Sequence, residues 1–303
     1  MSINNTVKKG VTKEIQNHLI RIYNDIFLAL SDLSQVNIFL CGGASTSSKK
    51  SIRDLLRIEL EKERFLKVLY PEDLLIDLLN RNKNKNLLEL EGFLADNSDI
   101  ICIISESPGS FAELGAFVTD ATIKNKVVAV VQSSFKRAKS FIMLGPIRLL
   151  MNMDKNKVIF FKKNDLNGLK KDLMKNVIKP AKNKKDNIRL DSIFGVDRII
   201  LLINYFYTGV TSEFIRDCLN FLFKQYLNGS TNNLQVLYKS ALKQLYKDKL
   251  IQKNSNSNSF VYELTKEGFK EIHFIMDNLY FHNSSRLFDE LRFDIMTYSY
   301  YSQ

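Results

Sequence analysis

The first half of this chain alternates short apolar runs with longer amphipathic stretches, and this alternation constrains the fold more than any other feature of the sequence. Such a pattern is typical of βαβ units, in which helices cover both faces of a parallel sheet. Apolar runs that indicate buried strands occur at Val36–Cys41, Phe65–Leu69, Asp99–Ser105, Val127–Val131 and Val158–Phe161. We therefore predict an α/β domain built on a doubly wound parallel sheet.

Amphipathic stretches lie between these runs and predict the covering helices. The expected helices are Ser51–Lys62, Pro71–Asn80, Leu87–Ala95 and Phe111–Lys124. A further amphipathic segment, from about Lys13 to Leu30, precedes the first strand. We expect this segment to form a helix that packs across the sheet.

The sequence changes character near residue 180. The segment 179–186 is rich in lysine and has almost no apolar residue, which is typical of a linker or an exposed turn. Helical runs follow at 193–207, 212–226 and 233–248, and the polar segment 253–259 then separates two short stretches at 249–252 and 260–264. Three helices followed by a β-hairpin predict a mostly helical, winged-helix domain. The expected division is an α/β domain at 1–178, a basic linker at 179–190 and the second domain at 191–303.

The composition is that of an ordinary globular protein, since 45% of the 303 residues are hydrophobic and 25% are charged. The longest apolar stretch, Ile199–Val210, is shorter than the ~20 residues that span a bilayer, so we expect no membrane-spanning segment. The first nine residues lack the apolar region of a secretory signal, and the three cysteines are odd in number and widely spaced. These features predict a cytoplasmic protein.

We expect no metal site, because the three histidines are far apart and no cysteine pair has ligand spacing.

The formal net charge of +11 favours a polyanionic partner, although a solvated lysine-rich surface explains it equally well. In the second domain, basic residues lie on the third helix and in the hairpin, namely Lys239, Lys243, Lys247 and Lys253. A basic helix with a basic wing suits contacts with nucleic-acid phosphates, so we predict that these four lysines bind nucleic acid. Winged helices also dock proteins, and the sequence leaves that alternative open.

Candidate ligand-binding residues follow the strands, because open parallel sheets bind ligands beyond the carboxyl ends of their strands. Gly42 and Gly43 follow the first strand and allow the backbone to approach a ligand closely, or they merely turn the chain. The segment matches neither a GxGxxG nor a Walker motif. Tyr70 and Asp73 follow the second strand and are candidates to stack on a base and to hold a sugar hydroxyl. Core packing and helix capping explain these two residues equally well.

Two carboxylates, Glu106 and Glu113, stand on either side of a Pro-Gly turn that leads from the third strand into a helix. A pair of carboxylates suits cleavage of a glycosidic bond, which proceeds through an oxocarbenium-like transition state. Ser110 and Glu113 also have the spacing of a capping box, in which the glutamate only satisfies backbone donors. The spacing alone leaves both interpretations open.

The segment Gly109-Ser-Phe-Ala-Glu-Leu-Gly115 resembles the Gly-Thr-x-x-Glu-x-Gly motif of nucleoside 2-deoxyribosyltransferases, whose glutamate attacks the anomeric carbon of a nucleoside. By that resemblance Glu113 is the catalytic nucleophile, and Gly109 and Ser110 belong to the substrate-binding turn. Four segments in order resemble retron-associated effectors, namely 38–43, 70–74, 106–117 and 140–150. Those effectors join a deoxyribosyltransferase-like domain to a C-terminal winged-helix domain.

The resemblance implies a toxic effector of bacterial anti-phage defence that works with a reverse transcriptase and its multicopy single-stranded DNA and RNA. It implies hydrolysis of the nicotinamide–ribose bond of NAD or of a related nucleotide, with NAD as substrate and no cofactor, and it is compatible with a higher-order assembly. Transferases have an Asp-rich loop where this chain has Glu106-Ser107-Pro108, which favours hydrolysis. Glu106 is then expected to orient a ribose hydroxyl or the attacking water. The alternatives are a nucleotide-sensing DNA-binding regulator without turnover and a deoxyribosyltransferase of nucleotide salvage.

Overall fold

The computed structural model describes residues 10–32, 35–70, 93, 97–183, 188–228, 233–256, 259–279 and 284–301. Contacts divide the chain into two compact units. One unit lies within residues 34–185, and the other combines residues up to 33 with those from 186 onward. The helices expected at 71–80 and 87–95 lie outside the described residues, apart from residue 93.

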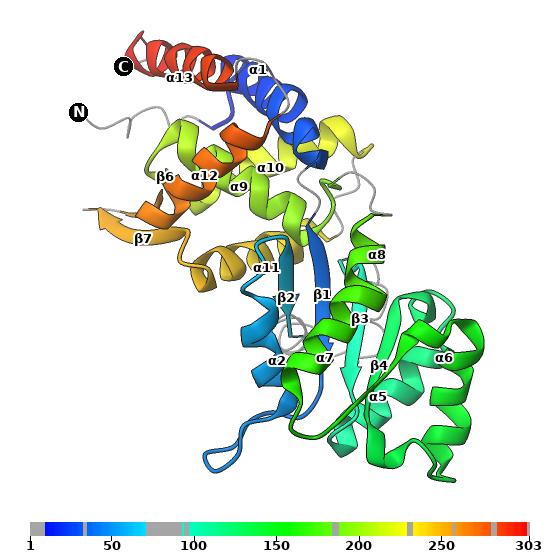
Figure 1. Cartoon of the computed structure of the whole chain (residues 1–303). Coiled ribbons are helices and arrows are strands. Elements are labelled where there is room, and N and C mark those ends of the chain that lie inside the picture. The colour runs from blue at the N-terminus through cyan, green and yellow to red at the C-terminus, as the bar shows by residue number, and fades with distance from the viewer. Residues whose placement is uncertain are drawn as a thin grey trace. The chain divides into compact units, whose positions relative to one another are not determined.

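The unit within 34–185 contains a five-stranded parallel sheet (Figure 1). Its strands are β1 (Val36–Cys41), β2 (Leu66–Leu69), β3 (Ile100–Ile104), β4 (Val127–Gln132) and β5 (Val158–Phe161). They follow the order β2-β1-β3-β4-β5, and every neighbouring pair is parallel. All five predicted strands are confirmed, with ends that differ by at most one residue.

Helices cover both faces of this sheet. Side chains of alternate strand residues, such as Ile38 and Cys102, form a core with α2 (Ile52–Leu60) and α7 (Leu166–Leu173). The intervening strand residues face the other way, because successive side chains in a strand point to opposite faces. On that side α5 (Pro108–Thr119) packs on β3 and β4, and α6 (Arg148–Met153) packs on β4. The prediction of an α/β unit with a parallel sheet is therefore confirmed.

The other unit contains helices and a three-stranded antiparallel sheet of order β6-β8-β7. Its elements from residue 193 onward are α9 (Ile193–Tyr207), β6 (Val210–Thr211), α10 (Ser212–Tyr226), α11 (Leu234–Lys247), β7 (Ile251–Asn256), β8 (Ser259–Leu264), α12 (Lys266–Asn278) and α13 (Ser284–Tyr301). Every residue of α9 is buried, so this helix forms the centre of the unit. The three predicted helices and the hairpin are confirmed. The two-residue strand β6 was not predicted, because it is too short to show alternation.

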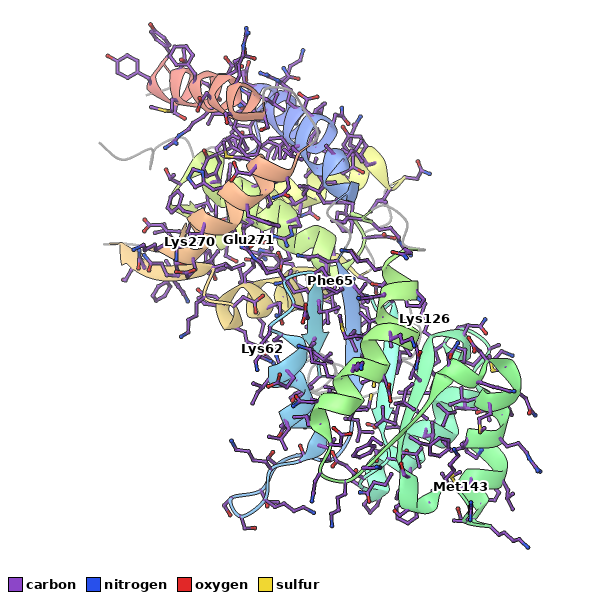
Figure 2. All side chains as sticks on the ribbon, in the orientation of Figure 1. Lys62, Phe65, Lys126, Met143, Lys270 and Glu271 are labelled. Atoms are coloured by element: carbon purple, nitrogen blue, oxygen red, sulfur yellow. The ribbon has the colours of Figure 1, made fainter. Side chains whose placement is uncertain are left out.

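One buried ion pair ties α12 to α9. Arg198 Nη1 lies 2.7 Å from Glu271 Oε1, and their side chains are 6% and 19% exposed. Lys270, labelled beside Glu271 in Figure 2, instead pairs at the surface with Glu267. Of these two adjacent residues of α12, Glu271 therefore faces the interior of the unit and Lys270 faces the solvent.

The N-terminal helical segment packs with the C-terminal unit. It consists of α1 (Lys13–Arg21), the π-helical turn η2 (Ile22–Phe27) and the 3-10 turn η3 (Leu28–Asp32). Tyr23 stacks on Tyr226 of α10 with ring centroids 3.8 Å apart, and Thr12 hydrogen-bonds Tyr298 of α13. The prediction that this segment packs across the sheet is wrong. Its amphipathic pattern shows that one face is buried but does not identify what covers that face.

The end of the sheet unit also differs from the expected boundary at residue 178. From α7 the chain continues as helix through η9 (Met174–Ile178) and α8 (Lys179–Lys182). Lys182 Nζ lies 4.4 Å from the ring centroid of Phe65, so α8 belongs to the sheet unit. A lysine-rich segment can form an exposed helix as well as a linker, which is why composition placed the boundary too early. Among the described helices, none combines the length and apolarity that a membrane crossing requires.

Candidate active site

The residues that follow β1 and β3 meet at one point of the sheet. Cys41 at the end of β1 is in register with Ile103 near the end of β3. The strand order runs in opposite directions from β1, toward β2 on one side and β3 on the other. Such a reversal opens a crevice beyond the carboxyl ends of the two strands, where ligands of doubly wound proteins bind. The structure therefore places Gly42, Gly43 and Glu106 at the expected binding position.

The carboxylate of Glu106 caps the N-terminus of α2. Its Oε2 accepts a hydrogen bond from Ile52 N at 3.0 Å, and its Oε1 accepts one from Arg53 N at 3.2 Å. These are the first two residues of the helix, whose free N–H groups and positive dipole end stabilise negative charge. Glu106 thus fixes the end of β3 to the beginning of α2. Sequence reasoning missed this contact because its partners lie more than fifty residues away.

Gly42 and Gly43 pass close to the same carboxylate. A Cβ atom added to Gly42 would lie 3.1 Å from Arg53 Cβ and 3.3 Å from Glu106 Oε1. A Cβ atom added to Gly43 would lie 3.3 Å from Glu106 Cγ. A glycine at either position is therefore explained by the close approach of the β1–α2 turn to Glu106, without reference to a ligand.

A capping box opens α5, and Glu113 is not part of it. The N-cap is Ser107, whose Oγ accepts from Ser110 N, and Ser110 Oγ accepts in return from Ser107 N. Pro108 is the first helical residue, so Glu113 lies in the second turn. The interpretation of Glu113 as the acid of a capping box is therefore wrong. The correct start was readable from Pro108, because proline is favoured at the first position of a helix.

Ser110 lies between the two glutamates in the sequence. Its Oγ also accepts a hydrogen bond from Glu106 N at 3.2 Å. Glu113 follows Ser110 by three residues, a spacing that places neighbouring side chains on the same side of a helix. Glu113 is partly exposed overall while its Oε2 atom is shielded from solvent. No described atom lies within 4 Å of a Cβ added to Gly109, so the space beside this residue is open.

Tyr70 belongs to a polar cluster at the edge of the site. Its hydroxyl donates to Asp54 Oδ1 at 2.6 Å, and the guanidinium carbons of Arg53 and Arg57 lie 4.2 and 4.3 Å from its ring centroid. Burial and the bond to Asp54 raise the pKa of the Tyr70 phenol. Asp54 also accepts from the backbone and the hydroxyl of Ser45 in the β1–α2 loop. Although burial opposes it, hydrogen bonding by Ser45 and Tyr70 lowers the pKa of Asp54 to about 2.

Sequence reasoning had singled out Tyr70 but neither Asp54 nor the two arginines. The available signal was their position in the first turns of the helix that follows the Gly-Gly turn. In the structure two guanidinium groups, those of Arg53 and Arg57, lie over the Tyr70 ring, and stacking of this ring on a base stays a prediction. Asp73, the other residue expected here, lies outside the described residues.

The lysines expected to bind nucleic acid lie in the second unit. Lys239, Lys243 and Lys247 recur every four residues along α11, which places them along one side of the helix. Lys243 and Lys247 are exposed, and Lys239 is half-buried. Lys253 lies on β7, with its Nζ 3.8 Å from the ring centroid of Phe260 on β8. Helix α11 thus carries three of the four predicted lysines, and the hairpin of β7 and β8 carries the fourth.

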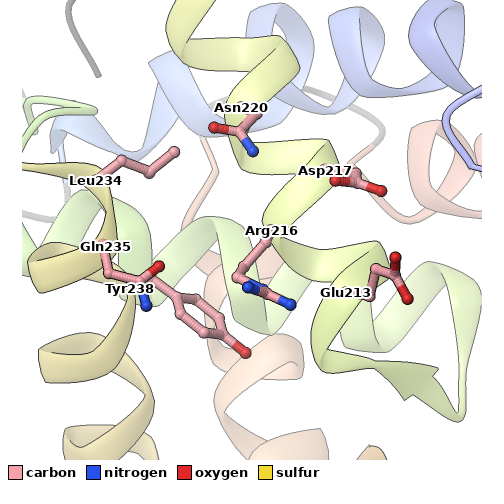
Figure 3. A pocket seen from close by; sticks show the side chains of 7 residues that line it. All are labelled: Glu213, Arg216, Asp217, Asn220, Leu234, Gln235 and Tyr238. Atoms are coloured by element: carbon pink, nitrogen blue, oxygen red, sulfur yellow. The ribbon is translucent and has the colours of Figure 1, made fainter. Parts of the chain in front are cut away.

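A polar pocket of about 370 Å³ lies between α10 and α11 of this unit (Figure 3). Its lining residues are Glu213, Arg216, Asp217 and Asn220 on α10 and Leu234, Gln235 and Tyr238 on α11. The pocket is in the unit that lacks the two glutamates of the candidate site. Sequence reasoning missed it, although the α10 residues have the spacing of one helix face.

The described residues include no group of three or more histidine, cysteine, aspartate or glutamate side chains that could hold a metal ion. Cys41, Cys102 and Cys218 are buried and form no disulfide. Burial raises the pKa of Cys102 to about 12, so its thiol stays protonated at neutral pH.

The fold and the site define a class of protein. It has a doubly wound α/β unit with the Glu106 carboxylate beyond the ends of β1 and β3, where the strand order reverses, and a helical unit with a small antiparallel sheet. A family model described as STM3845 retron effector protein matches residues 49–253, which is more than half of the chain. The chain belongs to this family of retron effectors. The expected resemblance to retron effectors is confirmed at that level.

Two relatives from Escherichia coli extend the comparison. The retron Ec86 protein, provisionally named a ribosyltransferase/DNA-binding protein, is 28% identical over 277 residues, which cover 87% of this chain and 85% of that protein. The retron Ec73 protein of the same provisional name is 34% identical over 119 residues, or 37% of each chain. The similarity to the Ec86 protein therefore extends over both units.

Proposed function

We propose that the α/β unit is an N-glycosidase that hydrolyses the nicotinamide–ribose bond of NAD or of a related nucleotide. The observation that carries this proposal is the position of Glu106 beyond β3 and against the turn after β1, with Glu113 in the second turn of the helix that follows Glu106 in the chain. Membership of the retron effector family and the ribosyltransferase part of the relatives' names support glycosyl chemistry.

In the proposed reaction, a Glu113 oxygen forms a bond to C1′ of the nicotinamide ribose. The C1′–N bond breaks, and its electron pair neutralises the pyridinium nitrogen, so nicotinamide leaves without needing a proton. Water then forms a bond to C1′, displaces the Glu113 carboxylate and loses its proton to solvent, which yields ADP-ribose. Glu106 orients the ribose hydroxyl or the water through the lone pairs that Ile52 N and Arg53 N leave unused.

The test is nicotinamide release from NAD by the purified full-length chain, followed by chromatography. Glu113→Gln should reduce the rate by at least about a hundredfold, because an amide is a poor nucleophile. Its circular dichroism should match that of the unsubstituted chain, since Glu113 is outside the capping box. Glu290→Gln, on the exposed face of α13, is the control and should retain full activity.

Unchanged release by Glu113→Gln would contradict the assignment. If the unsubstituted chain binds NAD without releasing nicotinamide, the sensing alternative is correct instead. If it transfers the sugar from a deoxynucleoside to a free base, the salvage alternative is correct.

We further propose that the second unit is a winged helix that binds nucleic acid. Its order α9-β6-α10-α11-β7-β8 and its sheet order β6-β8-β7 support a winged helix. The basic side of α11 and Lys253 support phosphate contacts, as does the DNA-binding part of the relatives' names. Docking of a protein through this unit is the alternative.

In this proposal the chain is a toxic anti-phage effector, restrained by a reverse transcriptase with its multicopy single-stranded DNA and RNA. Restraint is needed because an unregulated NAD-cleaving enzyme would deplete the host cell. Expression of the chain alone and with the neighbouring retron genes, with growth and NAD followed in both, tests this control. Equal toxicity in both conditions would reject it without affecting the glycosidase assignment.

A further inference from the structure

The usual phosphate position of this fold is filled by the protein itself. Phosphates bind at the N-terminus of the helix after β1 because its first four N–H groups lack partners within the helix. In α2 all four are satisfied: Ser51 N donates to Ser45 Oγ, Ile52 N and Arg53 N donate to Glu106, and Asp54 N donates to Ser51 Oγ. A negatively charged carboxylate thus occupies the place where a phosphate would bind.

The helix after β3 offers little more. Pro108 has no N–H group, and the N–H groups of Ser107 and Ser110 donate to each other's hydroxyl oxygens. Most of the N–H groups at these two helix starts are therefore satisfied within the protein, and charged side chains nearby become the candidates to bind the phosphates of a nucleotide whose ribose lies beside Glu106 and Glu113.

Such donors follow β4, the next strand of the sheet. Ser105 N still donates to Val130 O of β4 at 2.9 Å, so the chain enters Glu106 directly beside this strand. The loop after β4 carries Lys136, Arg137 and Lys139, all exposed. Neighbouring strands are ~4.8 Å apart, so this loop begins one strand away from Glu106. The loop then leads into the helical turn η7 (Met143–Ile147), which packs on α5, the helix of Glu113.

The charge of this loop is one-sided. The sequence has no aspartate or glutamate from residue 121 to residue 153. Within the described parts of the chain, Lys136, Arg137 and Lys139 form no salt bridge, while other cations do. The Lys136 ammonium lies 5.3 Å from the Phe160 ring centroid on β5. Lys136 is thus directed toward β5, away from β3. Arg137 and Lys139 remain available to a phosphate, for which guanidinium and ammonium groups are the usual partners.

We propose that Arg137 and Lys139 bind the phosphate groups of the nucleotide substrate, while its ribose lies against Glu106 and Glu113. This inference rests on the proposed function, because it assigns the substrate to the same crevice. It assigns two roles to residues beyond the carboxyl ends of the strands. Residues after β1 and β3 position the scissile bond, and the loop after β4 supplies the positive charge that recognises phosphate.

The test compares Arg137→Gln/Lys139→Gln with a matched control in the full-length chain. The control Lys124→Gln/Lys155→Gln removes the same charge before β4 and β5, at the opposite edge of the sheet. Two labels in Figure 2 mark these opposite ends of the strands: Lys126 lies just before β4, and Met143 follows the loop after β4. The test variant should raise KM for NAD about tenfold and leave kcat unchanged. Nicotinamide riboside, which has the same scissile bond without phosphates, should show no change in KM.

A second measurement separates this inference from the proposed function. Binding of ADP-ribose to each variant, measured by calorimetry, does not require turnover. If NAD is never cleaved but the test variant alone loses affinity for ADP-ribose, the glycosidase proposal fails and the phosphate site stands. The inference is overturned if the test variant raises KM for NAD and for nicotinamide riboside equally, or if the control variant raises KM for NAD as much as the test variant does. It is overturned as well if the test variant binds ADP-ribose with unchanged affinity. It is also overturned if only binding of a single-stranded DNA oligonucleotide is lost, which would make this edge a nucleic-acid surface.

Discussion

Replacing Glu106 by alanine should destabilise the α/β unit, because this side chain joins the end of β3 to the start of α2 by accepting hydrogen bonds from Ile52 N and Arg53 N. Hydrogen bonds to a charged group contribute about 1.5–3 kcal/mol each, which gives about 3–6 kcal/mol for the two. Glu106 is only half-buried, so water can reach the two N–H groups once the carboxylate is gone. We therefore expect a loss of about 2–3 kcal/mol in the free energy of unfolding, or about 5–10 °C in the Tm of a unit of this size.

The glutamine variant sharpens the expectation. Glu106→Gln keeps the length of the side chain, but one of its two terminal atoms becomes an N–H₂ donor. Whichever way the amide turns, this donor faces the N–H group of either Ile52 or Arg53. We expect Glu106→Gln to recover only part of the lost stability, about half of the alanine effect, because one of the two acceptors remains.

The assay is differential scanning calorimetry of the full-length chain, since two units can unfold in separate transitions and invalidate a two-state fit. The control is Glu290→Ala, whose ion pair with Arg286 lies at the surface of α13, with side chains 51% and 73% exposed. Such a pair contributes at most about 1 kcal/mol. If Glu106→Ala melts within a degree or two of this control, the bonds to α2 do not stabilise the unit and the reasoning is refuted.

Two further predictions concern acid stability and nucleic acid. Because the pKa of Asp54 is lowered to about 2 in the folded chain, its hydrogen bonds stabilise the fold above its ordinary value near 3.8 and are lost as pH falls from there toward 2. Urea unfolding between pH 4 and 2 should therefore show a smaller loss of stability in Asp54→Asn than in the unsubstituted chain, and equal losses would contradict the assigned bonds. For nucleic acid, Lys243→Gln/Lys247→Gln should reduce the slope of log affinity against log salt by about 0.7 per lost phosphate contact on single-stranded DNA. Lys224→Gln/Lys266→Gln is the control, and equal slopes for the two double variants would favour protein docking.

The sheet was predictable because its signal is local. Parallel strands buried on both faces require continuous apolar runs, and β1 and β5 begin and end where those runs do. The partner of the N-terminal helix was not predictable, because amphipathicity defines a buried face without identifying its neighbour. The stacking of Tyr23 on Tyr226 joins residues about two hundred positions apart, and neither residue shows this contact in its local sequence.

The candidate site divides in the same way. A strand end followed by glycine or glutamate is a local pattern, so Gly42 and Glu106 were found from the sequence. The hydrogen bonds that Glu106 accepts are nonlocal, and a carboxylate bonded to backbone N–H groups places no requirement on the side chains of its partners. The capping spacing of Ser110 and Glu113 pointed to a start of α5 that is three residues too late, and Pro108 was the local signal for the correct start.

Glu106 and Glu113 consequently give different information about the proposed reaction. Glu106 holds α2 in place, so a Glu106 variant that loses activity has lost either the orientation of the substrate or the position of the helix. Glu113 follows the capping box and takes no part in it, so Glu113→Gln changes the reacting group while the start of α5 stays intact. Activity of Glu106→Gln should therefore be measured well below its Tm and at saturating NAD. A loss of kcat that persists under those conditions, together with the loss in Glu113→Gln, would assign to Glu106 a role in the reaction beyond its role in the fold.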